Sequence, residues 1–240
     1  MGAQWKHAGR LENSSKRGAL ISKLVKEIMV AAKSGDSNPD NNARLRAAVE
    51  AAKKASVPRD NIERAIKKGS GQLDGQIIYE LVTYEGFAPH KVPVIVECLT
   101  ENKNRTAADI RVLFRKAQLG SMGSVVWMFD RLGVVEGTHA EKNIDIEGAA
   151  IEAGAQNVEP LEAHEIPQGH AGARFFCDST DLDSVSKALT KTGWTITTSE
   201  LSYIAKNDVE VAEEQKKEIV EFLNAIDDHD DVHRIYTALK

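Results

Sequence analysis

The sequence is poor in several kinds of residue, and each shortage excludes a class of protein. Two cysteines and six prolines occur among 240 residues, and aromatic residues make up 5% of the chain. Cys98 and Cys177 each lie in an apolar, strand-like stretch, so we expect buried, reduced thiols and no disulfide scaffold. No run of 18 apolar residues occurs, which excludes a transmembrane helix. The polar start MGAQWKHAGR lacks the apolar core of a secretory signal, and we expect none.

Charge is distributed unevenly along the chain. The whole sequence has a net charge of −5, yet residues 1–70 contain 15 Lys and Arg against 7 Asp and Glu. The balance is 6 against 7 in residues 71–130, 5 against 12 in 131–205 and 5 against 10 in 206–240. The overall pI near 5.8 therefore hides a basic N-terminal part. With 42% hydrophobic residues, the chain can bury the cores of two or three domains.

The basic part has the apolar spacing of three short amphipathic helices. ALISKLVKEIMVAAK carries one apolar stripe, and NARLRAAVEAAKKA repeats it after a break at SGDSNPDNN. A third helix begins near Pro58 and ends near Gly69. The side chains expected to face inward are Leu20, Ile21, Leu24, Val25, Ile28, Ala32, Leu45, Ala48, Val49, Ala52, Ile62, Ala65 and Ile66. Those expected to face outward are Lys23, Lys26, Lys33, Arg46, Lys53, Lys54, Arg64, Lys67 and Lys68.

From residue 77 the spacing becomes that of alternating strands and helices. IIYELVTY and VPVIVECL are predicted strands, RTAADIRVLFRKA a helix and GSVVWMF another strand. Residues 131–205 follow the order strand, helix, strand, strand, helix, strand, which suggests a ferredoxin-like unit. The final helix and strand, in VEVAEEQKKEIVEFLNAIDD and VHRIYTAL, cannot form a core alone, so we expect them to return to the preceding sheet. The predicted class is α+β, with a basic three-helix domain (1–76), a discontinuous α/β domain (77–130 and 206–240) and an inserted acidic ferredoxin-like βαββαβ domain (131–205).

A polar loop, ENKNRT, follows the strand-like run VPVIVECL and precedes a helix. Two interpretations of this loop are open. In the first, Asn102 and Asn104 form a turn, Thr106 caps the helix and Arg105 is solvated. In the second, the amides and cations of the loop hold a phosphate at the helix N-terminus. The residues alone do not decide between them.

No specific catalytic or metal-binding pattern occurs in the sequence. GSMGS lacks the GK[ST] ending of a phosphate-binding loop, so its glycines are expected to shape a turn. In DDHDDVH, His229 and His233 are four residues apart, but residues 232–236 look like a strand, which does not present such a pair as a helix does. We therefore interpret this segment as a solvated turn, and we expect no enzyme activity, no metal and no cofactor.

Four stretches of the chain carry a resemblance to a known family. They are NARLRAAVEAAKKASVPRDNIERAIKKGSG, YEGFAPHKVPVIVECLTENKNRT, GSMGSVVWMF and DDVHRIY, and they resemble the YebC family, also called PmpR. The resemblance extends over nearly the whole chain. It implies a cytoplasmic protein of three domains, the second discontinuous, without enzyme activity or cofactor. Members are described as probable DNA-binding transcriptional regulators, some as ribosome-associated translation factors, and organellar relatives activate translation of a cytochrome oxidase subunit.

The chain departs from the family pattern in three places. The basic GHSKWANIKHRK-like opening is thinner here, although Trp5, Lys6 and His7 remain. Ala88, His90 and Lys91 stand where the family has glycines after YEG, and the loop before GSV is short. These differences suggest a divergent subgroup.

Together these features predict a nucleic-acid-binding protein. An excess of eight positive charges in residues 1–70 favours a surface that neutralises phosphates, and the resemblance favours anion binding at ENKNRT. Few aromatic residues accompany the basic ones, so stacking on single strands is poorly supported. A DNA-binding transcriptional regulator is the first hypothesis. A translation factor that binds ribosomal RNA or tRNA and eases stalled translation is the alternative, and neither a membrane nor a small-molecule substrate is expected. The candidate nucleic-acid-binding residues are Lys6, Arg10, Lys16, Arg17, Lys23, Lys26, Arg46, Lys53, Lys54, Arg59, Arg64, Lys67, Lys68, Asn102, Lys103, Asn104, Arg105, Arg111 and Arg115.

Overall fold

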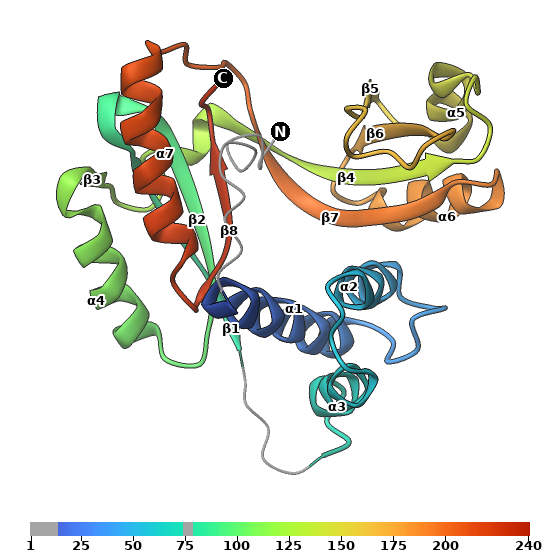
Figure 1. The fold of residues 1–240 in the computed structure, drawn as a ribbon, viewed down its shortest axis with the longest axis horizontal. Coiled ribbons are helices and arrows are strands. Elements are labelled where there is room, and N and C mark those ends of the chain that lie inside the picture. The colour runs from blue at the N-terminus through green and yellow to red at the C-terminus, as the bar shows by residue number, and fades with distance from the viewer. Residues whose placement is uncertain (1–13, 74–78) are drawn as a thin grey trace. The chain divides into compact units, whose positions relative to one another are not determined.

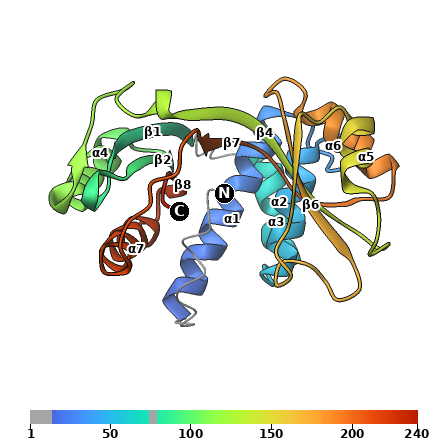
Figure 2. The same cartoon turned by 90° about the horizontal axis from the view of Figure 1, so that it is seen from above.

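The computed structural model of the protein describes residues 14–73 and 79–240 (Figures 1 and 2). The predicted α+β class is confirmed, with a helical N-terminal region and two four-stranded antiparallel sheets. Within the described residues, no helix is long and apolar enough to cross a lipid bilayer. The chain divides into two compact units. The described part of the first is 14–26, 79–130 and 203–240, and that of the second is 27–73 and 131–202.

Three helices form the N-terminal region, as predicted: α1 (Ser14–Ser34), α2 (Ala43–Lys54) and α3 (Arg59–Gly69). The Asn42 side chain begins α2 by accepting a hydrogen bond from the backbone N–H of Leu45 at 3.0 Å. Gly69 allows close packing, because a Cβ there would lie 2.3 Å from the carbonyl oxygen of Met29. The buried side chains of these helices are Ile28, Met29, Ala31, Ala32, Leu45, Ala48, Val49, Ala52, Ile62 and Ala65, together with Glu27.

The predicted orientation of the first helix is wrong at three positions. Leu20, expected to face inward, is 49% exposed. The side chains of Lys23 and Lys26, expected to face outward, are only 13% and 14% exposed. The reason is that residues of the C-terminal part pack against the predicted polar side of this helix and supply carboxylates to both lysines. A spacing rule applied to one helix does not detect such a partner.

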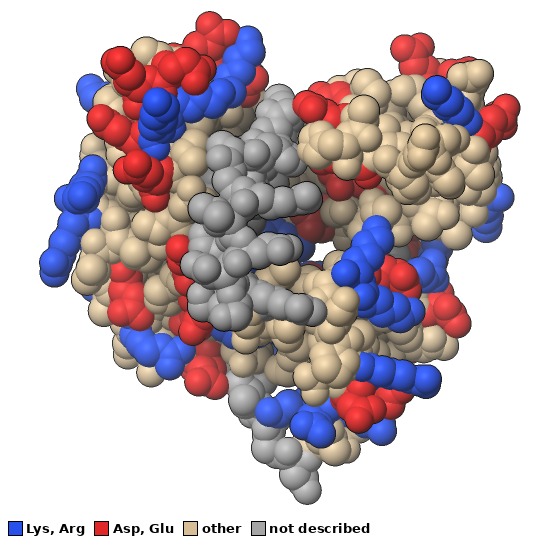
Figure 3. Space-filling model, viewed as in Figure 1, with Lys and Arg blue, Asp and Glu red and all other residues tan. Residues whose placement is uncertain are grey.

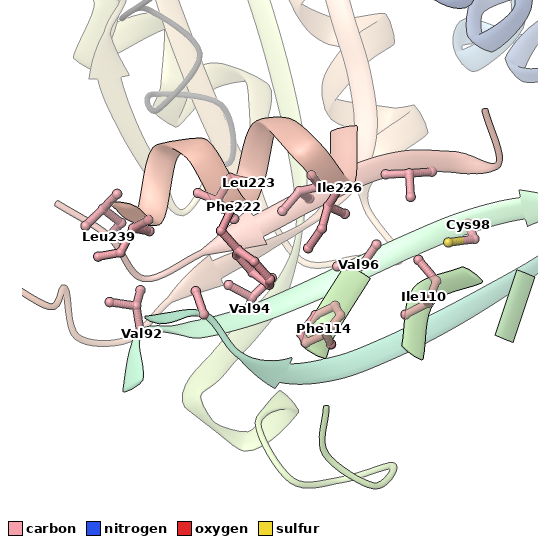
Figure 4. Packing of buried hydrophobic residues seen from close by; sticks show 14 residues of the cluster. Val92, Val94, Val96, Cys98, Ile110, Phe114, Phe222, Leu223, Ile226 and Leu239 are labelled. Carbon is pink, nitrogen blue, oxygen red and sulfur yellow. The ribbon is translucent and has the colours of Figure 1, made fainter. Parts of the chain in front are cut away.

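The first unit contains a sheet in which the C-terminal strand pairs with a strand from the middle of the chain. Its order is β3 (Gln118–Leu119), β1 (Glu80–Phe87), β2 (Pro93–Thr100) and β8 (Val232–Thr237). All eight residues of β2 are buried. Helices α4 (Lys103–Leu113) and α7 (Glu213–Asp227) both contribute to the hydrophobic core on one face of the sheet (Figure 4). Helix α4 ends at Leu113, before Ala117 where the predicted helix ended, because a 3-10 helix, η3 (Phe114–Lys116), follows it.

Successive side chains of β2 point to opposite faces of the sheet, as in any β-strand. Val94, Val96 and Cys98 point into the core shared with α4 and α7, and Ile95 belongs to the cluster on the opposite face. Phe114 and Phe222 meet edge to face, with ring centroids 5.2 Å apart. The other members of the core are Ala88, Val92, Ile110, Ile219, Leu223, Ile226, Val232, Ile235 and Leu239.

The opposite face of this sheet is covered by a segment whose predicted conformation is wrong. GSVVWMF is predicted to be a strand, but it forms a turn and the 3-10 helix η4 (Val126–Met128) before the next strand begins at Phe129. The cause is Glu85, a buried carboxylate on β1. It accepts hydrogen bonds from the backbone N–H groups of Gly123 at 2.7 Å, Val125 at 2.7 Å and Val126 at 2.8 Å. These three donors converge on one side chain and are therefore not available to a sheet.

The second sheet has the predicted strand and helix order. Its strands are β4 (Phe129–His139), β5 (Asn157–Pro160), β6 (Ala171–Cys177) and β7 (Thr195–Ala205), arranged β5-β6-β4-β7. Helices α5 (Ile146–Ala153) and α6 (Leu182–Lys191) pack on it, and Trp194 meets Phe175 edge to face at 4.9 Å.

The expectation for the cysteines is confirmed: both thiols are buried and free, and burial raises the pKa of Cys98 to about 12 and that of Cys177 to about 11.

The turn between β1 and β2 is left-handed although it contains no glycine. His90 and Lys91 have φ values of 60° and 62°, which L-residues adopt at a cost. We expect Lys91→Gly to exceed Lys91→Ala in free energy of unfolding by about 1 kcal/mol, because both remove the same charge and only glycine is unstrained at this φ. Urea unfolding of the two variants measures the difference. Equal stabilities would show that Lys91 is not strained.

Candidate nucleic-acid interface

Asp231 lies at the centre of a polar cluster in the first unit. Its buried carboxylate accepts hydrogen bonds from Lys26 Nζ at 3.1 Å, Arg105 Nη2 at 3.2 Å and Thr106 Oγ1 at 2.8 Å. Thr100 Oγ1 also donates to it, at 3.3 Å. Burial alone would raise the pKa of Asp231, but the hydrogen bonds from Lys26, Thr106 and Arg105 outweigh burial, so the pKa is lowered. The carboxylate is charged at neutral pH and unites three distant parts of the chain.

The end of α7 and the acidic turn before β8 also bind α1 directly. Lys26 Nζ donates a second bond, to the carbonyl oxygen of Asp230, at 2.8 Å. Lys23 Nζ binds the carbonyl oxygen of Asp227 and lies 3.2 Å from its carboxylate. These two lysines therefore serve the fold through ion pairs. Any contact that they make with a phosphate must compete with a carboxylate already in place.

At the ENKNRT loop, Asn102 rather than Thr106 is the helix cap. The Asn102 side chain accepts a hydrogen bond from the backbone N–H of Arg105 at 3.1 Å, and α4 already begins at Lys103. The suggested cap Thr106 is wrong: it lies inside α4, fully buried beside Asp231. Arg105 is not simply solvated, since it pairs with Asp231, and Lys103 pairs with Glu80. Asn104 is exposed.

The segment DDHDDVH is more than a solvated turn, which corrects its first interpretation. His229 Nε2 lies 3.2 Å from a carboxylate oxygen of Asp109, and Asp231 is only 4% exposed. His233 lies on β8. In the part of the chain that the structure describes, no group of three or more His, Cys, Asp or Glu side chains is arranged to hold a metal.

A cavity of about 590 Å³ opens beside Asp231. Lys26, Arg105 and His229 are among the side chains that line it. Five carboxylates also line it: Glu101, Asp109, Asp228, Asp230 and Asp231. The excess of carboxylates gives the cavity a negative local charge, which opposes the binding of a phosphate inside it.

The basic residues of α2 and α3 lie in different surroundings from Lys23 and Lys26. Over these helices, blue Lys and Arg side chains are interspersed with red Asp and Glu side chains (Figure 3). Lys53 pairs with Glu50 at 2.7 Å, and Arg59 pairs with Glu63 at 2.7 Å. Arg46 donates to the carbonyl oxygens of Pro39 and Asp40. Lys54, Arg64 and Lys67 are exposed, and no ion pair within residues 14–73 or 79–240 engages them.

The structure thus separates the predicted site residues by what their side chains contact. Those held in ion pairs or in hydrogen bonds to the backbone are Lys23, Lys26, Arg46, Lys53, Arg59, Asn102, Lys103 and Arg105. Those on the surface without an ion pair among the described residues are Lys54, Arg64, Lys67, Asn104, Arg111 and Arg115, with Lys68 half-buried. Lys6 and Arg10 lie outside the described residues, as do the side chains of Lys16 and Arg17.

Comparison with protein-family models decides the family. Residues 3–72 match the TACO1/YebC protein N-terminal domain, and residues 79–239 match the TACO1/YebC second and third domain. The chain belongs to the TACO1/YebC family. The resemblance found in the sequence is confirmed.

The relatives described next match this TACO1/YebC chain over nearly their whole length. A probable transcriptional regulatory protein of Pseudomonas syringae is 52% identical, with 100% of this chain and 99% of that protein covered. A protein of the same description from Bdellovibrio bacteriovorus is 49% identical, with both chains fully covered. The crystal structure of the conserved hypothetical protein Aq1575 from Aquifex aeolicus has a TM-score of 0.79 and 37% identity, and the match covers 99% of this chain and 96% of that one. The TACO1/YebC family is non-enzymatic, and this member is therefore not an enzyme.

Two acidic residues central to the structure of this TACO1/YebC chain were not among the sequence candidates. Asp231 binds Lys26 and Arg105, which lie 205 and 126 residues away in sequence. Glu85 binds N–H groups 38 to 41 residues away. The available signal for Glu85 was an acidic residue inside an apolar strand, because a buried carboxylate needs several donors.

Proposed function

We propose that the chain is a cytoplasmic, nucleic-acid-binding regulator of gene expression that acts on DNA as a transcriptional regulator. Its relatives are described as probable transcriptional regulatory proteins, which supports transcriptional regulation. The observation that carries the proposal is the exposed set of Lys54, Arg64 and Lys67, which no ion pair within the described residues neutralises. Exposed cations without partners attract phosphates and release their counterions on binding.

Phosphate contact, rather than reading of base edges, is the mode that this surface favours. Arg64 and Lys67 are three residues apart on α3, so they project from neighbouring positions of one helix. Lys and Arg at a helix surface position a nucleic acid by its backbone, whereas sequence is read by contacts with base edges in the grooves. The proposed binding is therefore strongly salt-dependent and has little preference for sequence.

The proposal includes an organisation into three domains: 1–76, 77–130 with 206–240, and 131–205. Pairing of β8 with β2 supports the discontinuous domain. The β5-β6-β4-β7 order, with one helix after the first strand and one after the third, supports a ferredoxin-like inserted domain. The first of the three carries the positive charge excess and would bind the phosphates.

The test replaces Lys54, Arg64 and Lys67 together with glutamine. We expect the affinity for a DNA duplex of about 20 base pairs to fall about tenfold or more at about 0.1 M salt, because three phosphate contacts are lost. The slope of log K against log salt should become shallower by up to about 2.7, at about 0.9 per contact. Fluorescence anisotropy over a salt series measures both quantities.

The matched control is Lys142→Gln with Lys191→Gln and Lys217→Gln, which removes the same charge from exposed positions elsewhere. It should leave the salt slope unchanged. If both triple variants lose affinity equally, net charge and not the α2 and α3 surface drives binding. If the unaltered chain binds no duplex, the proposed function is wrong.

A ribosome-associated translation factor is the second candidate, and the same surface favours it. DNA and folded RNA present identical phosphates to Lys54, Arg64 and Lys67. Sedimentation of a cell lysate through a sucrose gradient separates the two candidates. Migration with ribosomes that survives DNase treatment would support translation, and migration that DNase abolishes would support DNA.

A further inference from the structure

The loop of residues 120–127, anchored by Glu85, presents two large apolar side chains to solvent. Met122 is 94% exposed and Trp127 is 63% exposed. Three backbone N–H groups of the loop donate hydrogen bonds to the buried Glu85 carboxylate and so hold the loop on β1. The indole N–H of Trp127 donates to the carbonyl oxygen of Ser124 at 3.1 Å. The ring is thus fixed by its edge while much of its surface stays open.

The surroundings of this Glu85-anchored loop are cationic. Residues 110–129 contain Arg111, Arg115 and Lys116 and no Asp or Glu. All three cations are exposed, and none forms an ion pair within the described part of the chain. Asp130, the next acid along the chain, lies 3.4 Å from Lys206. A fixed aromatic ring and unpaired cations are the two components with which proteins bind single-stranded nucleic acid.

Contacts with β1 bring η3 and the loop to the same end of that strand. A Cβ added to Gly86 would lie 2.8 Å from the ring of Phe114, the first residue of η3. Leu119 pairs with Gly86, and the backbone N–H of Gly120 donates to the carbonyl oxygen of Glu85 at 2.8 Å. Arg115 and Lys116, which follow Phe114, therefore lie beside the loop that carries Trp127.

We propose that the Glu85-anchored loop binds an unpaired nucleobase by stacking on Trp127, while Arg115 and Lys116 contact the flanking phosphates. The proposal rests on the proposed function and makes it more specific, because the nucleic acid that the chain recognises would include a single-stranded segment. The entropy lost on binding by ordering this loop and the Trp127 ring is small, because Ser124 already holds the ring and Glu85 already holds the loop. Stacking tolerates any base, because every base has a π-face.

A protein partner is the other occupant that an exposed tryptophan suggests, and the charges favour it less. Protein interfaces surround an apolar anchor with a larger apolar area. In residues 115–127, Val126 and Leu119 are half-buried, and apart from Met122 and Trp127 the exposed residues are Arg115, Lys116, Gln118, Ser121 and Gly123. The surface thus resembles a stacking platform more than the centre of a protein interface.

The test measures binding of the full chain to labelled oligo(U) and oligo(dT) of about 12 nucleotides and to a duplex of the same length. Trp127→Ala should weaken binding of the single strands about 5- to 100-fold and leave duplex binding unchanged. Trp127→Phe should restore most of the affinity, because it keeps an aromatic face. Arg115→Gln with Lys116→Gln should make the salt dependence of single-strand binding shallower by up to about 1.4, at about 0.7 per phosphate. Ile151→Ala, which removes a side chain 78% exposed on α5, is the control and should change nothing.

Each outcome decides the proposal. A loss on both oligonucleotides, or on oligo(U) alone, supports it, and the second result identifies RNA as the ligand. If Trp127→Ala binds single strands like the unaltered chain while the duplex is bound normally, the stacking proposal is wrong and the proposed function stands. If the unaltered chain binds neither, both fail. If Trp127→Ala changes only the sedimentation coefficient of the chain, the loop is a protein contact and the proposal is overturned.

Discussion

Replacing Asp231 with asparagine should lower the free energy of unfolding by about 3–5 kcal/mol, the usual cost of removing one partner of a buried ion pair. The carboxylate of Asp231 is 5% exposed and faces Lys26, whose side chain is 14% exposed. Asparagine has nearly the same shape, so the change removes charge without leaving a cavity. Lys26 would then keep its charge with little water and no buried counterion.

The pH dependence of this effect has a definite sign. The pKa of Asp231 is lowered in the folded protein, so its contribution to stability is fully present above the unfolded pKa, about 4. The contribution is lost as the pH falls through the lower folded value. The difference in stability between the unaltered chain and Asp231→Asn should therefore be constant above about pH 5 and shrink below about pH 4.

Urea unfolding, with amide hydrogen exchange of β2 and β8 as a local probe, measures the Asp231→Asn effect. The control is Arg105→Ala, which removes a donor of the same cluster whose side chain is 51% exposed. Arg105→Ala should cost much less, because water replaces the guanidinium at the surface. Equal costs for the two variants would contradict the view that Asp231 and Lys26 form the buried centre of the cluster.

Elements whose stability depends on neighbours close in sequence were predictable. The apolar spacing of NARLRAAVEAAKKA correctly placed Leu45, Ala48, Val49 and Ala52 in a core, and the alternation in GARFFCD correctly indicated β6. In both segments one face of the helix or strand is buried, and apolar residues then recur with the period of that element.

Predictions failed where a distant side chain decided the conformation. Lys23 and Lys26 have the spacing of solvent-facing residues, yet carboxylates about 200 positions later cover them. GSVVWMF has the composition of a strand, yet the Glu85 carboxylate takes three of its backbone donors. Thr106 follows a turn and resembles a cap, yet Asn102 caps α4 and Thr106 is buried against Asp231. Sequence reasoning located the basic region but could not separate exposed cations from those that the fold neutralises.

Replacing Glu85 with glutamine is the second change with a large expected effect. Hydrogen bonds to a charged acceptor contribute about 1.5–3 kcal/mol, and a buried N–H left without a partner costs about 1–3 kcal/mol. Glutamine keeps one oxygen for Val125 and Val126 but turns an NH2 group toward the N–H of Gly123, so one donor loses its partner and the others lose a charged acceptor. We therefore expect a loss of about 2–4 kcal/mol. Glu80→Gln, on the same strand with a side chain 55% exposed, is the matched control and should have little effect.

The Glu85→Gln variant also links stability to the loop that carries Trp127. Burial alone would raise the pKa of Glu85, but the backbone donors of Gly123, Val125 and Val126 outweigh it and lower the pKa. The stability that Glu85 contributes is thus present above about pH 4.5 and lost as the pH falls through its lower folded pKa, so the difference in stability between the two chains should shrink as the pH falls below about 4.5. At neutral pH, hydrogen exchange at Gly123, Val125 and Val126 should be faster in Glu85→Gln, and exchange in the second sheet should be unchanged. Slow exchange at all three amides in the variant would show that the loop holds its shape without the carboxylate.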